Sequence, residues 1–261
     1  MTYPVSKIDW DSAFLGYPIG AIELAEYDEG KLQATLDACK PHFRLVVISL
    51  LSNGPDELNT SNVPCICYDR KLVFKKQVVS PVSPVDPRIR AYVSPLCSSQ
   101  IEQLAILSGT YSRFKKDPEL SAHYERLYLT WINHAVRGEL ADAVWTWYEG
   151  RKIFGLMTLR VAKRVNPATN ETQREVRVGM LSVHAEKRHQ GIGGALLDVC
   201  DFWSESLSIP TVSLSTQADN ADICSLCKHK GYQQVNEETV YHYWSPGWSY
   251  NPRRGWMWTE C

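Results

Sequence analysis

A glycine-rich segment, RHQGIGG, occupies residues 188–194 between a strand-like run, VRVGMLSVH (176–184), and a stretch with apolar residues at helical spacing. Glycines there let the backbone approach a ligand without a Cβ in the way. The free N–H groups and the positive dipole end of the next helix would then hold an anion. A pyrophosphate suits such a site, and Arg188 would add positive charge. Alternatively, Gly191 and Gly193 only make a tight strand-to-helix turn.

The same segment excludes two common nucleotide sites. It matches neither G-x-G-x-x-G nor G-x-x-x-x-G-K-[ST], so the sequence predicts neither a dinucleotide fold nor a P-loop. His184 precedes this segment and His189 lies within it, and we expect both to lie at the surface or to contribute main chain rather than to act as bases.

Cysteines are the second set of residues that could do chemistry. Cys65-x-Cys67 and Cys224-x-x-Cys227 could together form a four-thiolate zinc site. However, the first pair lies on an apparent strand and the second on an apparent helix, where such residues are commonly buried. We therefore expect reduced thiols, typical of the cytosol, and no metal.

Composition and charge limit the classes of protein to which the chain could belong. The 261 residues carry a net charge of −1, so no overall field favours nucleic acid or an anionic membrane as a partner. The longest apolar run, LVVISLL (45–51), is far shorter than the ~20 residues of a membrane-spanning helix. The first residues, MTYPVSKIDWD, lack the pattern of a signal peptide. We expect a cytoplasmic protein.

The first ~95 residues predict a small α/β domain. Strand-like runs cover 19–27, 43–51 and 71–79, and a helix is expected over 31–40. Three prolines within SPVSPVDP (80–87) indicate a boundary or an edge connection.

A longer series follows, in the order ααβββαβαβ, which predicts a layered α/β domain. Ser99 and Glu102 form a capping-box pattern, and Gly138 and Gly231 are placed to end helices. A loop is expected over 110–120 and a polar turn over VNPATNETQRE, with a final strand pair through Tyr243. The other expected elements are helices 121–137, 191–206 and 220–230 and strands 143–149, 152–164, 176–184 and 211–216.

Two motifs of this series resemble the GNAT acyltransferase superfamily. The pattern [RQ]-x-x-G-x-[GA] is met by Arg188 to Gly193, after a strand containing Leu181 and Val183. A second pattern, N-x-x-A/I-x-x-L-x-x-x-x-G-[FY], is met further on by Asn220, Ile223, Leu226, Gly231 and Tyr232. The resemblance covers about 96–246. It implies a GNAT fold, a central mixed twisted sheet with helices on both faces, behind the smaller domain of residues 1–95 and before a tail, 247–261.

A finer resemblance involves four further segments, WDSAFLGYPIG (10–20), TYSRFKKDP (110–118), YERLYLTWINHAVRGELAD (124–142) and STQADN (215–220). They are similar to nucleotide-sugar N-acyltransferases of the TDP-fucosamine acetyltransferase type. That resemblance implies acyl transfer from acyl-CoA, acetyl or larger, to the amine of a nucleotide-linked, dTDP-type, amino-dideoxyhexose.

The GNAT resemblance also implies cofactor contacts. Main-chain groups of Leu181, Ser182 and Val183 would bind the pantetheine arm, and those of 189–194 the pyrophosphate. Asn220 would lie near the thioester, or serve only as a helix N-cap. The implied cofactor residues are Leu181, Ser182, Val183, Arg188, His189, Gln190, Gly191, Ile192, Gly193, Gly194 and Asn220.

The chain departs from the superfamily at the usual tyrosine general acid, where Cys227 stands. A thiol, with an ordinary pKa of about 8.5, could donate a proton to the departing coenzyme A thiolate. It could equally be a small apolar filler, with water as the proton donor.

The sequence gives weaker indications of the residues that would contact the acyl acceptor than of those that would contact the cofactor. Trp10, Asp11, Phe14 and Tyr17 could bind the base or sugar, or pin the N-terminus to the core. Ser112 and Arg113 lie on the loop that lines the acceptor side in the superfamily, where Arg113 would bind a phosphate or form a surface ion pair. The tryptophan-rich tail could cover the acceptor, enter a homodimer interface or be disordered.

Two other functions remain open. A GNAT that acylates a protein, amino-acid or antibiotic amine would share the segment 178–200 but not the motif at 10–20. A non-catalytic acyl-CoA- or nucleotide-sugar-binding module would fit the replacement of the usual tyrosine by Cys227.

Overall fold

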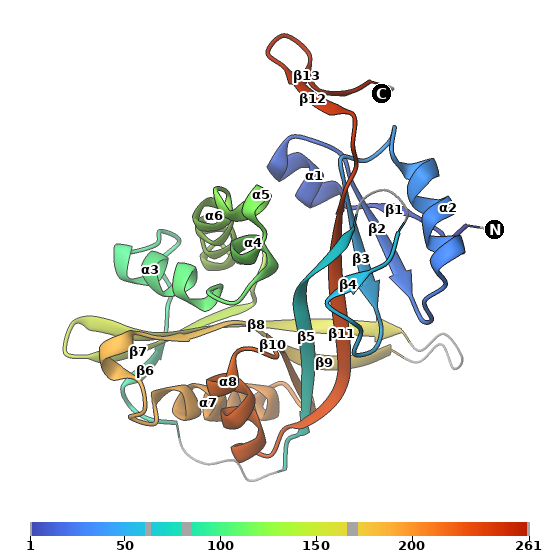
Figure 1. The fold of residues 1–261 in the computed structure, drawn as a ribbon. Coiled ribbons are helices and arrows are strands. Elements are labelled where there is room, and N and C mark those ends of the chain that lie inside the picture. Colours follow the sequence, from blue (N-terminus) through green and yellow to red (C-terminus); the bar gives the residue numbers. More distant parts are fainter. Residues whose placement is uncertain (1, 61–63, 80–84, 166–171, 260–261) are drawn as a thin grey trace. The chain divides into compact units, whose positions relative to one another are not determined.

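The computed structural model describes residues 2–60, 64–79, 85–165 and 172–259 (Figure 1). The chain divides into unit 1, residues 1–72 and 236–261, and unit 2, residues 73–235. Both divisions fall inside long strands, β5 (Cys65–Gln77) and β11 (Gln233–Trp244). They differ from the boundaries expected at 95 and 246, because residues 73–95 cluster with unit 2 and 236–246 with unit 1. Most of the proline-rich segment (80–84) and of the polar turn (166–171) lies outside the described residues.

Unit 1 is built on a mixed sheet with the strand order β1-β2-β3-β11. Strands β2 and β3 are parallel and are connected through α2, whereas β1 and β11 run antiparallel to their neighbours. The short β4 pairs with β5. The elements are β1 (Ser6–Lys7), α1 (Asp9–Leu15), β2 (Ile19–Leu24), α2 (Glu29–Cys39), β3 (Leu45–Leu50) and β4 (Glu57–Leu58).

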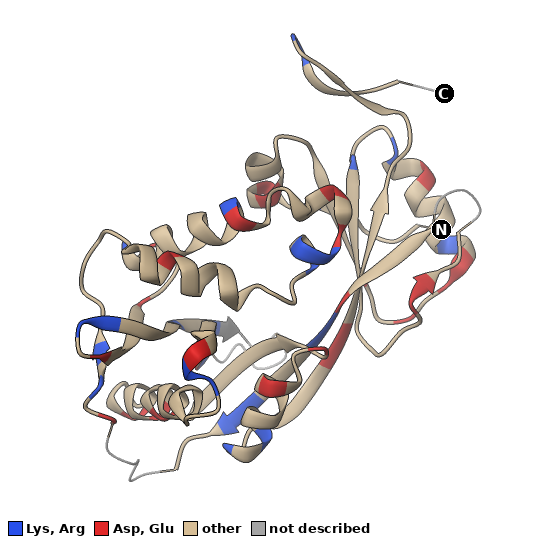
Figure 2. Ribbon diagram, turned by 60° about the vertical axis from the view of Figure 1, so that its left-hand side comes forward, with Lys and Arg blue, Asp and Glu red and all other residues tan. Residues whose placement is uncertain are grey.

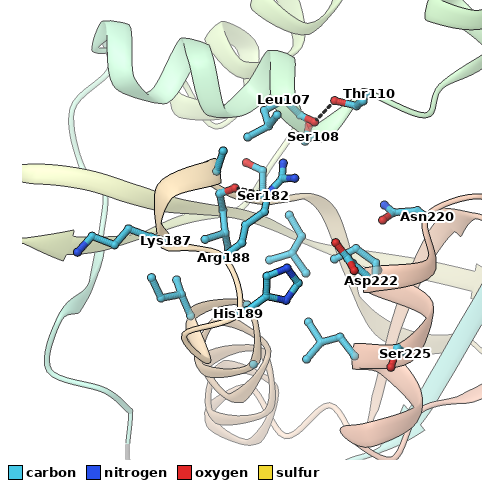
Figure 3. A pocket seen from close by; sticks show the side chains of 18 of the residues that line it. Leu107, Ser108, Thr110, Ser182, Lys187, Arg188, His189, Asn220, Asp222 and Ser225 are labelled. Atoms are coloured by element: carbon cyan, nitrogen blue, oxygen red, sulfur yellow. Dashed lines mark hydrogen bonds between the residues drawn. The ribbon is translucent and has the colours of Figure 1, made fainter.

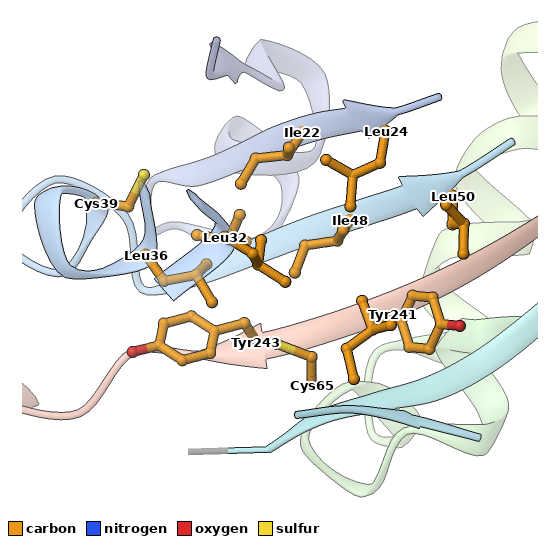
Figure 4. Packing of buried hydrophobic residues seen from close by; sticks show 12 residues of the cluster. Ile22, Leu24, Leu32, Leu36, Cys39, Ile48, Leu50, Cys65, Tyr241 and Tyr243 are labelled. Carbon is orange, nitrogen blue, oxygen red and sulfur yellow. The ribbon is translucent and has the colours of Figure 1, made fainter. Parts of the chain in front are cut away.

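The core of unit 1 forms where α2 covers this sheet (Figure 4). Leu32, Leu36 and Cys39 recur at helical spacing and are buried, so they present one apolar face of α2. Tyr241 and Tyr243 of β11 share this cluster with residues of β2 and β3. Strand β11, near the C-terminal end of the sequence, is therefore part of the core of unit 1.

Unit 2 is a layered mixed α/β domain, as the sequence predicts. Its strand order is β10-β9-β8-β7-β6, with β5 next to β10. β9 and β10 are parallel, and the other pairs from β9 to β6 are antiparallel. Helices α3 and α6 lie over one face of the sheet, and α7 and α8 over the other (Figure 1). The strands are β6 (Ile89–Ala91), β7 (Ala143–Glu149), β8 (Lys152–Val165), β9 (Thr172–Val183) and β10 (Thr211–Gln217).

Helix ends in unit 2 largely follow their predicted signals. The helices are α3 (Ser99–Ser108), α4 (Arg113–Lys116), α5 (Pro118–Ser121), α6 (Tyr124–Val136), the 3-10 turn η1 (Ala185–Lys187), α7 (Ile192–Ser206) and α8 (Ala221–His229). Gly138 (φ 79°) and Gly231 (φ 80°) follow α6 and α8 in the left-handed conformation that ends helices. At α3 the prediction was wrong by one residue, because the hydroxyl of Ser98, not Ser99, accepts from the Ile101 N–H at 3.4 Å. The predicted loop 110–120 contains α4 and α5.

Where the sequence predicts a final strand pair through Tyr243, the structure has one long strand, β11. The tail beyond it forms a hairpin of β12 (Trp248–Asn251) and β13 (Gly255–Trp258). The Arg44 guanidinium carbon lies 3.3 Å from the ring centre of Trp256 and 4.5 Å from that of Tyr17. The Trp248 indole N–H donates to the Lys40 carbonyl at 2.8 Å. The tail is thus attached to unit 1 by aromatic and cation–π contacts.

Charge and hydropathy add two observations. Lysine and arginine are interspersed with aspartate and glutamate along the elements of both units (Figure 2), in keeping with the net charge of −1. Within the described residues, no helix combines the length and the apolar character needed to cross a membrane.

Trp256→Ala should release the hairpin, because it removes the cation–π contact with Arg44, worth about 0.5–2 kcal/mol. Trypsin should then cleave after the exposed Arg253 and Arg254 several-fold faster, as followed by mass spectrometry under native conditions. Trp256→Phe keeps a ring over Arg44 and should show a smaller effect. Equal cleavage rates for wild type and Trp256→Ala would mean that this contact does not hold the tail.

Candidate active site

The site begins with an irregularity in β9. Met157 of β8 pairs with Leu181 and Leu159 with Val178, so Gly179 and Met180 together oppose Thr158. This is a β-bulge. The Met180 N–H donates to the Thr158 hydroxyl at 2.8 Å, and a Cβ on Gly179 would lie 2.7 Å from that oxygen. Glycine at 179 and a hydroxyl at 158 therefore suit this bulge.

Beyond the bulge, β9 separates from its parallel neighbour. The two strands pair in register from Val176 to Val178 and from Val212 to Leu214. In the described structure, the residues that follow, up to Val183 and Gln217, are not in register with each other. Strand ends that separate in this way leave main-chain N–H and C=O groups available to a ligand.

A cavity of about 780 Å³, cavity 1, opens at the end of β9 (Figure 3). Arg188 and His189, from the loop before α7, lie across it from Asp222 and Ser225 of α8 (Figure 3). Its lining comprises Leu107, Ser108, Thr110, Tyr111, Lys115, Leu181, Ser182, Val183, Ala185, Lys187, Arg188, His189, Gly191, Ile192, Gly193, Gly194, Asn220, Asp222, Ile223, Ser225, Leu226 and His229.

The loop before α7 has the backbone of an anion site. Gly191, the N-cap of α7, has φ 81°, and His189 has φ 58°, uncommon for a residue other than glycine. No side chain caps α7, so its first-turn N–H groups have no side-chain acceptor. Together with the helix dipole, they suit a phosphate group.

Charges around cavity 1 favour the same kind of ligand. Among the described lining residues, Lys115, Lys187 and Arg188 are cationic and Asp222 is anionic. Lys187 pairs with Glu149 at 2.7 Å. The Arg188 Nε–H donates to the carbonyl of Val183 at 3.3 Å, which joins the loop to the end of β9.

The glycines of the loop have different structural roles. A Cβ on Gly193 would lie 3.1 Å from Leu226, and one on Gly194 2.9 Å from Lys230, so these two residues let α8 pack closely on α7. Gly191 differs, because a Cβ there would meet nothing within 4 Å. Close helix packing therefore accounts for Gly193 and Gly194, whereas Gly191 supports a turn that borders open space.

A second cavity, cavity 2, of about 340 Å³, adjoins the first. It is lined by Ser108, Tyr128, Trp131, Ala135, Leu140, Thr158, Gly179, Met180, Leu181, Leu214, Ser215, Thr216, Gln217, Asn220 and Ile223. Ser108, Leu181, Asn220 and Ile223 line both cavities. Cavity 2 thus lies at the bulge and at the diverging end of β10, and the two cavities meet beside the same strand end.

The predicted cofactor residues gather at cavity 1, with one exception. Gln190 is not among the described lining residues, and its side-chain amide donates to the Glu186 carbonyl at 3.2 Å. Asn220 occupies the N-cap position of α8, but its side chain donates to the Thr216 hydroxyl at 3.3 Å and does not cap the helix. Its position, where both cavities meet, favours the ligand-facing role.

The position of Cys227 does not suit the predicted role of a general acid. Its side chain is fully buried and belongs to the described lining of neither cavity. Burial raises the pKa of the Cys227 thiol to about 12. Proton transfer to a thiolate whose acid has an ordinary pKa of about 8.5 would then be uphill by roughly 5 kcal/mol. Inaccessibility and high pKa both favour the role of apolar filler.

The predicted acceptor contacts are not among the described lining residues of either cavity. Trp10 and Phe14 stack on α1 of unit 1, with ring centres 5.3 Å apart. Tyr17 is buried and packs on Arg44 and the tail, as expected if it anchors the chain. In unit 2, Ser112 is buried at the N-cap of α4, and Arg113 lies over the Phe114 ring at 4.5 Å. His184 packs edge-on against Phe154.

Several lining residues were not singled out from the sequence. Tyr128 and Trp131 lie in the predicted helix 121–137 and residues 215–217 in the segment STQADN, and the sequence alone indicates no separate role for any of them. Lys115, Asp222 and His229 gave no signal, because isolated charged residues on helices are usually solvent-facing. As for a metal, the described residues contain no group of three or more His, Cys, Asp or Glu positioned to bind one.

A known protein family and several solved structures resemble this chain. Residues 104–232 match the model of the acetyltransferase (GNAT) family. Among solved structures, a functionally unknown conserved protein from Staphylococcus epidermidis ATCC 12228 is 12% identical, with a TM-score of 0.51 over 87% of this chain and 85% of its own. A putative GNAT acetyltransferase from Novosphingobium aromaticivorans DSM 12444 is 14% identical, with a TM-score of 0.46 over 87% and 83%.

A tandem GNAT protein from the clavulanic acid biosynthesis pathway is 12% identical and has a TM-score of 0.49 over 87% of this chain and 75% of its own. Among curated protein sequences none matches the chain. Residues 104–232, which contain helices α6 to α8 and residues that line both cavities, therefore resemble a GNAT acetyltransferase domain.

Gly191→Asn should weaken binding of coenzyme A at least tenfold, because asparagine tolerates a positive φ but adds a side chain beside cavity 1. Isothermal titration calorimetry would measure the affinity. Gly138→Asn is the matched control, since Gly138 has the same backbone conformation and open surroundings after α6. An unchanged affinity of Gly191→Asn would remove the anion-site assignment of the loop.

Cys227→Ala should lower the free energy of unfolding by about 1 kcal/mol, because it leaves a small cavity beside α8. The kcat should stay within about twofold of wild type. Thermal melts and steady-state kinetics would be compared with those of Cys224→Ala, a half-buried position on the same helix. A loss of kcat beyond a hundredfold at an unchanged Tm would show instead that the thiol takes part in the chemistry.

Proposed function

We propose that the protein transfers an acyl group from acyl-CoA to the amine of a nucleotide-linked amino sugar. The observation that carries this proposal is the meeting of two cavities at Ser108, Leu181, Asn220 and Ile223. Cavity 1 would hold coenzyme A and cavity 2 the acceptor, so the thioester and the amine would come together at these four residues.

The residues around cavity 1 fit coenzyme A. The N–H groups at the start of α7 and the guanidinium of Arg188 suit the pyrophosphate. Residues 181–183 of β9 pair with β8, but in the described residues they have no register partner in β10, and that side of the strand suits the amide groups of the pantetheine arm. Main-chain N–H groups of the same strand end would stabilise the oxyanion that forms when the amine attacks the thioester. Acyl-CoA supplies the activated acyl carbon, and no metal is required.

The residues around cavity 2 fit an uncharged sugar ring. None of its described lining residues is aspartate, glutamate, lysine or arginine. An ammonium group or an α-carboxylate would enter such a cavity without a charged partner, at a considerable desolvation cost. A sugar amine is less basic than the lysine amine (about 10.4) and enters more readily as the neutral nucleophile. Trp131 offers an apolar face and residues 215–217 offer hydrogen-bonding groups.

The nucleotide end of the acceptor is assigned from the finer sequence resemblance. It supports Arg113 as a contact to a phosphate, and Ser112 beside it on the loop before α4. A dTDP-linked amino-dideoxyhexose is therefore the proposed acceptor class.

The test measures coenzyme A release with a thiol reagent, for acetyl-CoA and larger acyl-CoA donors, over a panel of amines. We expect turnover with dTDP- or UDP-linked amino sugars, with a product mass raised by the acyl group. The panel also contains lysine peptides, free amino acids and aminoglycoside amines. Turnover confined to these amines would show that the acceptor is not an amino sugar. Coenzyme A binding without any turnover would identify a binding module instead.

A further inference from the structure

The lining of cavity 2 includes polar groups where it meets cavity 1 and becomes apolar further along α6. Ser108 and Asn220, which line both cavities, carry a hydroxyl and an amide. The Asn220 amide also donates to the Thr216 hydroxyl at 3.3 Å. Ala135 and Leu140 line cavity 2 only and have no polar side-chain atom. This difference indicates how an acceptor would lie in the cavity.

One face of α6 follows cavity 2. Tyr128, Trp131 and Ala135 recur at helical spacing, and all three line the cavity. Tyr128 lies beside Ser108, because a Cβ on the next residue, Gly109, would be 2.0 Å from Tyr128 Cζ. Ala135 follows two helical turns later, about 10 Å further along the axis of α6. It therefore lies at the end of the cavity away from Ser108.

Leu140 lies where cavity 2 meets solvent, because it lines the cavity and is 37% exposed. Its loop, between α6 and β7, is held on both sides. The N–H groups of Glu139 and Leu140 donate to the His134 carbonyl at 3.0 and 3.4 Å, and the His134 ring contacts the Glu139 carboxylate. On the other side, the Asp142 carboxylate accepts from the Val161 N–H of β8 at 2.6 Å. The loop thus keeps this leucine at the opening.

Ala135 leaves space at this end of the cavity. It is the smallest of the three α6 side chains that line cavity 2, and it is buried. Neither Ala135 nor Leu140 offers a side-chain hydrogen bond. A hydroxyl placed between them would lose water without gaining a partner from either, whereas a methyl group would gain from burial.

We propose that Ala135 and Leu140 form an apolar subsite that selects the acceptor, taking a methyl group on the sugar ring and disfavouring a hydroxymethyl or carboxylate group at the same ring carbon. This inference rests on the proposed acyl transfer to an amino sugar and adds the residues that distinguish one amino sugar from another. The sugar ring lies along α6, with its amine at the residues shared by the two cavities and its methyl group at Ala135.

The test compares two dTDP-linked amino sugars that differ only in carrying a methyl or a hydroxymethyl group at the same ring carbon. Wild-type kcat/KM should be roughly ten- to a hundredfold higher for the methyl sugar, the range that an apolar pocket achieves against an added hydroxyl. Ala135→Ser and Leu140→Ser should each reduce this ratio at least threefold, because the new hydroxyl can pair with that of the substrate. Their calorimetric affinity for coenzyme A should stay within about threefold of wild type.

Ala135→Leu should fill the subsite and lower kcat/KM at least tenfold for both sugars, with coenzyme A affinity again within about threefold. Leu96→Ser is the matched control, since Leu96 is another exposed leucine of unit 2 and belongs to the described lining of neither cavity. It should leave the ratio unchanged. The Tm and coenzyme A binding report whether Ala135→Leu folds, and if it does not, Leu140→Ser at its exposed position decides the question.

Three results would overturn the subsite while leaving the acyl transfer intact. One is a wild-type kcat/KM that is equal within twofold for the two sugars. Another is an unchanged ratio in both serine variants. The third is an Ala135→Leu enzyme whose preference changes between acetyl-CoA and butyryl-CoA rather than between sugars, which would place the acyl chain at this end of cavity 2. A wild-type protein that acylates no amine of the panel would contradict the proposed function itself.

Discussion

The hydrogen bond from the Met180 N–H to the Thr158 hydroxyl is the contact on which the site depends. It stabilises the bulge in β9, and the bulge redirects the strand away from β10. Because the strands then diverge, main-chain groups remain available at residues 181–183 and space opens on both sides of that strand end. Cavity 1, cavity 2 and their four shared residues all adjoin this point.

Main-chain groups form most of the site, so some of its residues could be predicted from the sequence and others could not. The glycine-rich loop and the asparagine before α8 are defined by residue type, since only certain residues adopt the backbone that the fold requires there. These positions could be predicted, and the layered order of strands and helices with them. The bulge could not, because VGMLSV reads as an uninterrupted strand until the register with β8 is known.

Acceptor residues were harder to predict for a different reason. Tyr128 and Trp131 have the spacing of any amphipathic helix, so nothing in the sequence separates residues that line a cavity from residues that fill a core. The same ambiguity affected Cys227, where a motif position suggested chemistry but burial makes it inaccessible. The hairpin of the tail was also missed, since its contact with Arg44 joins residues more than two hundred positions apart.

Unit 1 is discontinuous, because its core is completed by Tyr241 and Tyr243 of β11. During synthesis at roughly 5–20 residues per second, the growing chain would present β2, α2 and β3 well before the strand that completes their sheet. The edge of β3 with which β11 pairs would remain unpaired until the whole of unit 2 had emerged from the ribosome. Nascent-chain chaperones would therefore meet this protein chiefly through its N-terminal unit, and ribosome stalling near the 3′ end of the message would leave that unit unfinished.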